Sequence, residues 1–376
     1  MAYFIINKYG PQEMGTYMLA VSISIPLAYF LLMDAPSKIL TGMSNTKNLF
    51  QILGPAFCFS FVLITLLILN HLSQFVNISS FIILIPVFFH KLSETIVELE
   101  IAYLKKHQYF KLIFWVILRR QFFIYLVSIL MLFYGFNLVF IFITMALISC
   151  ILSYFSILNL KKFGWSFKPV YFGSYFRREL SLAFAIGLKF LSSNVLRYFV
   201  VYIYGLSIFG YMAPAFYALT AFSNVSTVLE NVLTPRFLKI IQDKQQILSN
   251  VKLDLFLVSF ASVIIFISAY LFAEDVYSLF YPEQKDKYAS IIIIFSSGFF
   301  FYVMRAILKS VSIKIGLEKI QIYVQCFSIL LLILLLLLFN TAYGVYAPAL
   351  AFVLTSFGIC ALYLLLIVRH KLKIDP

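Results

Sequence analysis

The chain has 376 residues, of which 63% are hydrophobic and 12% charged, with a formal net charge of +14. About a quarter of the residues in an ordinary soluble domain are charged, so this composition excludes a soluble globular protein. The apolar residues must instead face lipid or pack within a membrane.

Eleven apolar segments follow one another along the chain. Each is near the length at which a helix crosses a bilayer, roughly 17–25 residues. The stretch Ala2–Asn7 in front of them is apolar but too short to cross. The predicted spans are residues 15–33, 49–70, 74–93, 112–134, 137–158, 181–203, 205–229, 255–273, 289–308, 320–339 and 346–368.

Lysine and arginine gather in alternate connections between these spans. Short connections rich in Lys and Arg stay in the cytoplasm, so the C-terminus is predicted to be cytoplasmic. The same asymmetry accounts for the positive net charge without nucleic acid as a partner. The basic regions hold 24 of the 29 Lys and Arg residues and lie at 34–48, 91–120, 159–180, 230–254, 305–319 and 369–373.

A short motif recurs at an offset of 195 residues. Tyr9-Gly10, followed by Gly-Thr-Tyr-Met, returns as Tyr204-Gly205, followed by Gly-Tyr-Met. A full apolar span precedes the second copy and only eight residues precede the first. We therefore expect the opening helix of the first half to be incomplete, with further apolar residues encoded upstream. Internal repeats of this kind are common in transporters.

The sequence thus predicts an all-α polytopic membrane protein with two six-helix lobes in pseudo-twofold parallel repeat. About 11 of the transmembrane helices are complete in this chain. The predicted parts are an N-terminal lobe over 1–158, a cytoplasmic linker over 159–180 and a C-terminal lobe over 181–376.

Two cations lie deep within the span 181–203. Lys189 and Arg197 share one helical face with Ser193, at positions i, i+4 and i+8. A charge that faces lipid at this depth costs at least about 2.5–3.5 kcal/mol. One hypothesis is that the three residues line a cavity and bind an anionic substrate. The alternative is that both long side chains snorkel to the membrane surface.

Most other charged residues lie near helix ends. Glu94 and Glu98 belong to an amphipathic extension of the third span, where a solvated face with ion pairs is the default and ion coupling the alternative. Asp34 and Glu230 end matching helices of the two halves and are candidate gate residues, with solvation at the helix end as the simpler interpretation. Arg119 and Arg120 are expected to snorkel to the cytoplasmic surface.

The sequence contains no motif typical of an enzyme active site or a metal site. The four cysteines all fall inside apolar spans, and the four histidines show no ligand spacing. No Gly-rich phosphate loop or nucleophile motif is present. We expect neither a metal nor another cofactor, and no catalytic residue.

Several patterns together carry a resemblance to a known family. Tyr-Gly-Pro-Gln-Glu-Met-Gly-Thr-Tyr over 9–17, and Ser193-Asn194-x-x-Arg197-Tyr198 with Gly210-Tyr211, resemble Wzx-type polysaccharide and O-antigen flippases of the MOP superfamily. Later segments continue the likeness in order, although the family usually has twelve or more helices. These segments are Leu233-Thr-Pro235-Arg236, Leu279-Phe280-Tyr281 and Tyr343-Gly344-Val-Tyr-Ala-Pro-Ala.

The resemblance implies two lobes around a central cavity in the bacterial cytoplasmic membrane. It implies translocation of an undecaprenyl-diphosphate-linked oligosaccharide by alternating access, with basic cavity residues near the diphosphate. Arg197 matches an arginine often found in the family's seventh helix. The lipid-linked glycan and the bilayer are the expected partners, and a polysaccharide polymerase and glycosyltransferases are candidate ones.

Two other functions stay open. A multidrug or cation antiporter of the same superfamily needs acids in its cavity, whereas the deep charges here are basic. A membrane glycan polymerase needs a large outer loop or paired catalytic acids. The largest outer loop is 274–288, with only Glu274-Asp275 as neighbouring acids.

Overall fold

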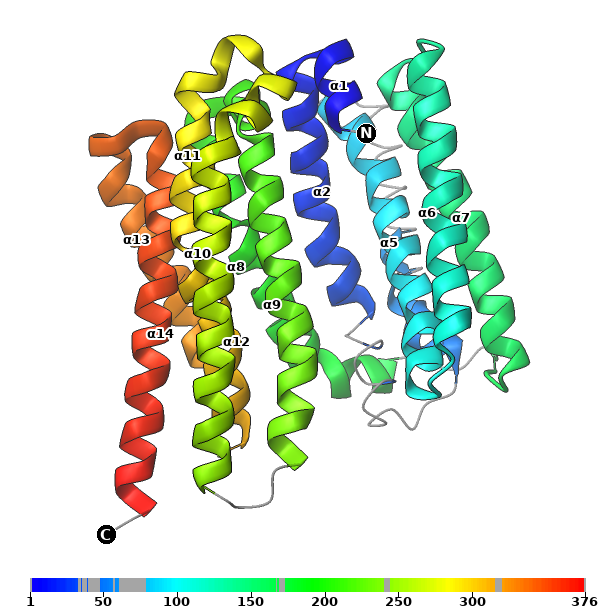
Figure 1. Ribbon diagram of the computed structural model, residues 1–376. Coiled ribbons are helices and arrows are strands. Elements are labelled where there is room, and N and C mark those ends of the chain that lie inside the picture. The colour runs from blue at the N-terminus through cyan, green and yellow to red at the C-terminus, as the bar shows by residue number, and fades with distance from the viewer. Residues whose placement is uncertain are drawn as a thin grey trace. The chain divides into compact units, whose positions relative to one another are not determined.

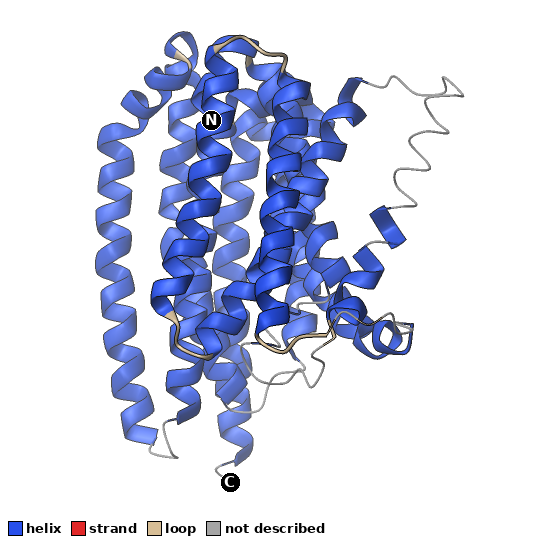
Figure 2. Ribbon diagram, turned by 90° about the vertical axis from the view of Figure 1, so that its right-hand side faces the viewer, coloured by secondary structure: helices blue, strands red, loops and turns tan. Residues whose placement is uncertain are grey.

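The computed structural model describes residues 2–32, 48–60 except Phe57, 79–166, 168, 173–239, 244–314 and 320–374, together with Ala35 and Ile39. These residues form helices, and no strand occurs among them (Figures 1 and 2). The principal helices are α1 (Ala2–Tyr9), α2 (Pro11–Leu32), α5 (Ser79–Lys106), α6 (Phe110–Phe133), α7 (Leu138–Lys162), α8 (Gly173–Tyr211), α9 (Ala213–Lys239), α10 (Lys244–Phe280), α11 (Lys285–Ser297), α12 (Phe299–Lys314), α13 (Ile320–Tyr343) and α14 (Ala347–Ile374).

The helices confirm the prediction of an all-α polytopic membrane protein. Within the described ranges, six helical stretches are long and apolar enough to cross a membrane. One of them covers α11 and α12, and another covers α13 and α14. A bent pair, Ser193–Tyr211 with Ala213–Ser226, brings the number to seven. The predicted span 49–70 lies only partly inside the described residues.

Two predicted spans differ in detail from the helices. The span 289–308 is divided at Gly298 into α11 and α12. The chain bends by 94° between Tyr211 and Ala213, where α8 meets α9. A separate kink lies inside α8 at Gly205, which adopts φ 81° and ψ 173°. Only glycine adopts these angles readily, because a side chain there would collide with the backbone.

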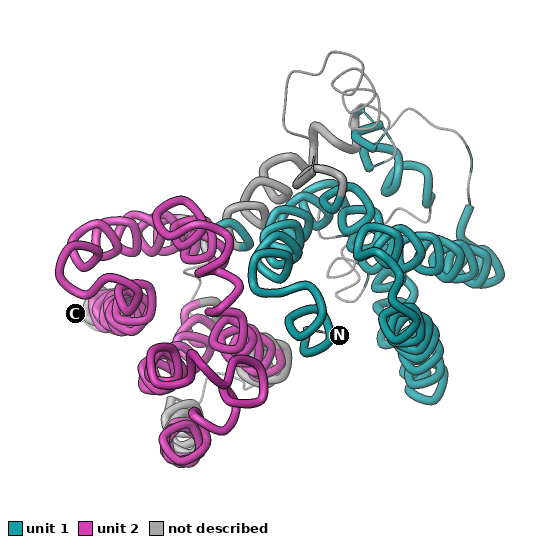
Figure 3. Tube along the Cα trace, turned by 90° about the horizontal axis from the view of Figure 1, so that it is seen from above, with its two compact units in different colours: residues 1–191 teal, residues 192–376 magenta. Residues whose placement is uncertain are grey.

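The chain forms two compact units, Met1–Leu191 and Ser192–Pro376 (Figure 3). The boundary between them falls inside α8. In the first unit α5 packs on α2 and on α7, and in the second α12 packs on α9 and on α14. The last two helices of each unit, α6–α7 and α13–α14, also pack on one another. This shared packing order is the parallel repeat that the motif predicted.

The repeated Tyr-Gly motif has the same structure in both units. Gly10 and Gly205 have φ values of 87° and 81°. The Tyr9 hydroxyl donates a hydrogen bond to the Phe136 carbonyl, in the turn between α6 and α7. The Tyr204 hydroxyl donates to the Gly344 carbonyl at 2.6 Å, in the turn between α13 and α14. In each unit a tyrosine thus connects the first helix to the last hairpin.

Three buried serines satisfy their hydroxyls within their own helices. Ser22 donates to the Met18 carbonyl at 2.7 Å, Ser128 to Ile124 at 2.6 Å and Ser262 to Val258 at 2.6 Å. Each serine is at most 8% exposed. Small residues let neighbouring helices approach closely, which matters in lipid because packing replaces the hydrophobic drive between helices. The hydroxyls add no unsatisfied polar group to these faces.

Candidate functional site

Arg197 lies on α8 and contacts α9. Its Nη1 donates to Asn194 Oδ1 and its Nη2 to Thr220 Oγ1, both at 2.7 Å. Its guanidinium carbon lies 5.8 Å from the ring centre of Phe216, which is fully buried. Thr220 in turn donates to the Phe216 carbonyl at 2.8 Å. These contacts hold the guanidinium in one orientation against the α8–α9 pair.

No described acidic residue lies next to the positively charged guanidinium of Arg197. Its hydrogen-bond acceptors are an amide and a hydroxyl, and its Nε is buried without a partner. The ionisable groups close enough to affect it electrostatically are the phenols of Tyr198, Tyr217 and Tyr302. A half-buried cation surrounded by neutral dipoles and aromatic rings is suited to bind an anion.

The other members of the predicted stripe are described less fully. Lys189 and Ser193 lie on α8, in the same helix as Arg197, so the predicted helical spacing holds. The Ser193 side chain is exposed, and its hydroxyl accepts a 3.5 Å hydrogen bond from Asn194 Nδ2. The side chain of Lys189 lies outside the described part of the structure. Substrate binding by the stripe therefore stays a prediction.

A second group of charges lies inside the first unit, between α5 and α6. Glu94 Oε2 accepts from Lys91 Nζ at 2.7 Å, and Glu94 Oε1 pairs with Arg120 Nη2 at 2.7 Å. The Arg120 side chain is 9% exposed. The expectation that Arg120 snorkels to the membrane surface is therefore wrong, because a carboxylate of the neighbouring helix neutralises it where it lies.

The ion pair expected on this face of α5 is present between Lys91 and Glu94, and the Glu94 side chain is 26% exposed. Its second partner, Arg120 of the neighbouring helix, was not expected. Glu98, one turn further on, is half-buried and accepts a hydrogen bond from the Tyr29 hydroxyl at 2.7 Å. The Tyr29 ring stacks on Phe190 with 4.3 Å between ring centres. Glu94 thus forms ion pairs with two cations, whereas Glu98 accepts a hydrogen bond from a neutral hydroxyl.

The two candidate gate acids are not tested. Asp34 lies outside the described residues. Glu230 lies on α9, but its side chain is not described. The described residues contain no group of three His, Cys, Asp or Glu that could hold a metal ion.

Sequence reasoning missed the partners of both cations. The signal available for Arg120 was an acid on the preceding helix, about 18 Å before the end of α5 at Lys106. No comparable signal marked Thr220 or Phe216, because hydroxyl and aromatic residues occur throughout these spans.

The architecture has close counterparts among solved structures. A structure titled "Lipid II flippase MurJ, inward closed conformation" matches with a TM-score of 0.71 at 16% identity, over 98% of this chain and 84% of that one. An inward-facing multidrug resistance MATE family transporter of the MOP superfamily matches with a TM-score of 0.65 at 12% identity, over 100% and 94%. The eukaryotic MATE transporter AtDTX14 matches with a TM-score of 0.60 at 14% identity, over 98% and 93%.

The fold thus defines a multi-pass membrane protein with the two-lobed architecture of the MOP superfamily. A family model described as "Polysaccharide biosynthesis protein" matches residues 44–290, more than half of the chain. The protein belongs to this family of polysaccharide biosynthesis proteins. A search of curated protein sequences found no match.

Proposed function

We propose that the protein is a flippase that moves an undecaprenyl-diphosphate-linked oligosaccharide across the bacterial cytoplasmic membrane by alternating access. The family supports a role in polysaccharide biosynthesis, and the fold supports a transporter of the MOP type. The observation that carries the choice of substrate is Arg197, whose described partners are all neutral. A diphosphate would supply the missing negative charge, and a guanidinium binds phosphate oxygens in a bidentate manner.

The charged residues of the first unit are a less suitable site for the diphosphate than Arg197. Lys91 and Arg120 are both engaged by Glu94, and Glu98 lies one turn away, so two acids balance two bases. An anion gains little from a cluster that is already neutral. We therefore assign the diphosphate to Arg197, with Ser193 and Lys189 as further ligands on the same helix.

The experiment is translocation of a fluorescent lipid-linked oligosaccharide in vesicles containing the purified protein. Replacing Arg197 with Ala removes one charge-assisted interaction of about 1.5–3 kcal/mol, so transport should fall at least about tenfold. Arg197→Lys should retain more activity, because it keeps the charge but loses the bidentate geometry. Lys189→Glu should abolish transport by repelling the anion.

The matched control is Arg369→Ala, which removes an exposed arginine near the end of α14. Its transport rate should equal that of the wild type when the two proteins are reconstituted in equal amounts. If Arg197→Ala inserts normally and transports at the wild-type rate, the diphosphate binds elsewhere.

The alternative of a multidrug or cation antiporter has weaker support. Glu94 is paired with two cations and offers no free charge to a cationic drug. The described donors to Glu98 and Glu100 are the neutral groups of Tyr29 and Asn159, so these two acids are the ones that an antiporter would use. Efflux of an organic cation such as ethidium, measured in the same vesicles, distinguishes the two functions. Efflux without glycan transport would favour the antiporter.

A further inference from the structure

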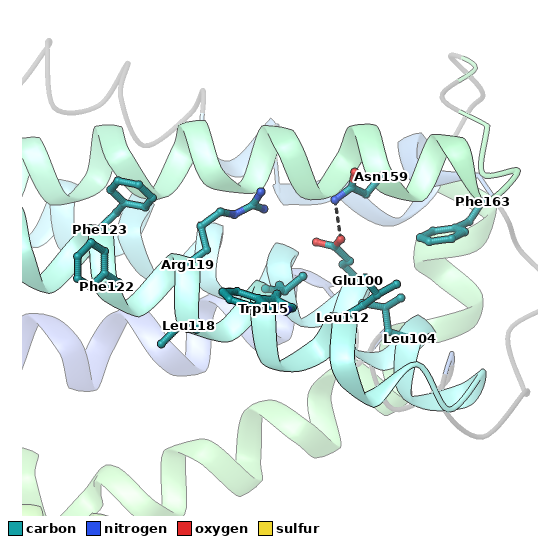
Figure 4. Close-up of a pocket in the computed structure, with 11 residues that line it drawn as sticks. Glu100, Leu104, Leu112, Trp115, Leu118, Arg119, Phe122, Phe123, Asn159 and Phe163 are labelled. Atoms are coloured by element: carbon teal, nitrogen blue, oxygen red, sulfur yellow. Dashed lines mark hydrogen bonds between the residues drawn. The ribbon is translucent and has the colours of Figure 1, made fainter.

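A pocket of about 600 Å³ opens between α5, α6 and α7 of the first unit (Figure 4). Its position follows from the helix ends. Glu100 lies six residues before the end of α5, and Asn159 three residues before the end of α7. At 1.5 Å per residue these depths are about 9 and 5 Å. The polar side of the pocket thus lies within about two helical turns of the ends of α5 and α7.

Glu100 brings an incompletely satisfied carboxylate to this pocket. The residue is 2% exposed. Its Oε1 accepts a hydrogen bond from Asn159 Nδ2 at 2.8 Å, whereas its Oε2 is buried and has no partner among the described residues. A buried acceptor without a donor is unfavourable, so a ligand that carries N–H or O–H groups would be stabilised here.

Arg119 provides the opposite charge. Figure 4 shows its guanidinium and the Glu100 carboxylate extending into the same part of the pocket. Its guanidinium carbon lies 6.0 Å from the ring centre of Phe155, and no ion pair joins it to a described acid. The pocket therefore contains one anionic and one cationic group that do not neutralise each other by direct contact.

The remaining walls are apolar and partly open to the membrane. Trp115 is 55% exposed, Phe122 56% and Phe123 46%. In Figure 4 the two phenylalanines extend the pocket beyond Arg119, on the side away from Phe163. Exposed aromatic rings next to a polar pocket suit a ligand with a charged head and a hydrocarbon chain.

We propose that this pocket binds a phospholipid whose headgroup carries both a primary ammonium and a phosphate, as in phosphatidylethanolamine. The ammonium would donate to Glu100 Oε2, the phosphate would accept from Arg119, and an acyl chain would lie along Phe122 and Phe123. Opposite charges on the two sides of the pocket match the order of charges in this headgroup. The site lies within one unit and is separate from Arg197, so it does not depend on the transported substrate.

The charge pattern favours this headgroup over two common ones. Phosphatidylcholine has the same charges but no N–H donor, so it leaves Glu100 Oε2 unsatisfied. Phosphatidylglycerol has hydroxyl donors but no cation to balance the Glu100 carboxylate. Exposed lysines at the nearby helix ends, Lys105, Lys106 and Lys161, attract anionic lipids in general and do not select among zwitterionic ones.

The test is lipid binding to the full-length protein in detergent, measured by native mass spectrometry with one lipid at a time. Phosphatidylethanolamine should bind about tenfold or more tightly than phosphatidylcholine of the same chains. Glu100→Gln should abolish this preference, and Arg119→Gln should weaken both lipids. Equal binding of the two lipids to the wild type, tighter binding of phosphatidylglycerol, or a preference that survives Glu100→Gln would each overturn the proposal.

Matched controls are Glu274→Gln and Arg369→Gln, which change exposed residues of the same types outside the pocket. Both should keep the wild-type preference.

A second measurement uses a protein with Glu100 unchanged, so it does not depend on the folding of the Glu100→Gln variant. Trp115 and Trp165 are the two tryptophans of the chain, and Trp165→Phe leaves Trp115 as the sole reporter.

In this Trp165→Phe protein, phosphatidylethanolamine with brominated acyl chains should quench Trp115 fluorescence in a saturable manner. Unlabelled phosphatidylethanolamine should reverse the quenching at about one tenth of the concentration that phosphatidylcholine requires. Equal potency of the two competitors would exclude recognition of the ammonium.

Discussion

At the scale of single residues, the two units compensate their buried cations in opposite ways. Arg120 is neutralised by Glu94 across a 2.7 Å ion pair, whereas Arg197 is held by the neutral oxygens of Asn194 and Thr220. A buried ion pair is a structural element whose loss is costly. A buried cation with neutral ligands retains its charge for an external partner.

The Glu94–Arg120 pair should therefore affect stability. Replacing Glu94 with Gln leaves Arg120 and Lys91 without their carboxylate, at a cost of about 3–5 kcal/mol. The double variant Glu94→Gln with Arg120→Gln should recover much of this loss, because no unpaired guanidinium remains. Thermal unfolding of the four proteins of this double-mutant cycle, in one detergent, measures the coupling. Additive losses would mean that the pair contributes nothing by itself.

Glu98 is the better candidate for ion coupling among the acids of α5. Its described hydrogen bond comes from the neutral Tyr29, so it has more freedom to exchange a proton or cation than Glu94. We predict that Glu98→Gln lowers transport driven by a proton or sodium gradient by about tenfold or more and leaves gradient-free exchange intact. The control is Glu274→Gln, an exposed acid. Equal loss in both assays would indicate a structural role for Glu98.

At the scale of elements, the Tyr-Gly motif explains how each unit attaches its opening helix. Tyr9 and Tyr204 bond to the last hairpins of their own units, at Phe136 and at Gly344. Tyr204 also donates to Asn340 in α13. Tyr9→Phe and Tyr204→Phe should each lower the free energy of unfolding by about 1 kcal/mol. Because the two contacts lie in different units, the losses should add in the double variant, as thermal unfolding can show.

The glycine of the motif makes a different contribution. At Gly205 a Cβ would meet no atom within 4 Å, so the cost of a side chain arises from the backbone angles alone. Gly205→Ala should destabilise the protein by roughly 1–3 kcal/mol and disturb the kink inside α8. Ser207→Ala, an exposed change two residues away, is the control. Thermal unfolding that is the same for both variants would show that the kink inside α8 does not need glycine.

At the scale of the whole molecule, the orientation in the membrane is predicted from charge alone. Reporter fusions after Lys162 should be cytoplasmic, and fusions after Asn340 should lie on the opposite side, because basic connections alternate along the chain. Alkaline phosphatase and green fluorescent protein fusions at both positions measure this. The reverse pattern would overturn the orientation, although not the helical architecture.

Hydrophobicity along the chain determined the class of this protein and the positions of α2, α6, α7, α13 and α14. A membrane span is a local property, since every backbone group must be satisfied within one helix. The repeat was also readable, because duplication leaves similar residues at a constant offset.

Tertiary structure decided which charged residue meets which partner. Arg120 and Glu94 are 26 residues apart, Arg197 and Thr220 are 23, and Tyr204 and Gly344 are 140. Nothing in the local sequence distinguishes an arginine that snorkels from one that a neighbouring helix neutralises, because both occupy apolar spans. Helix packing selects the partner, and the partner determines whether a buried charge stabilises the fold or remains available to a ligand.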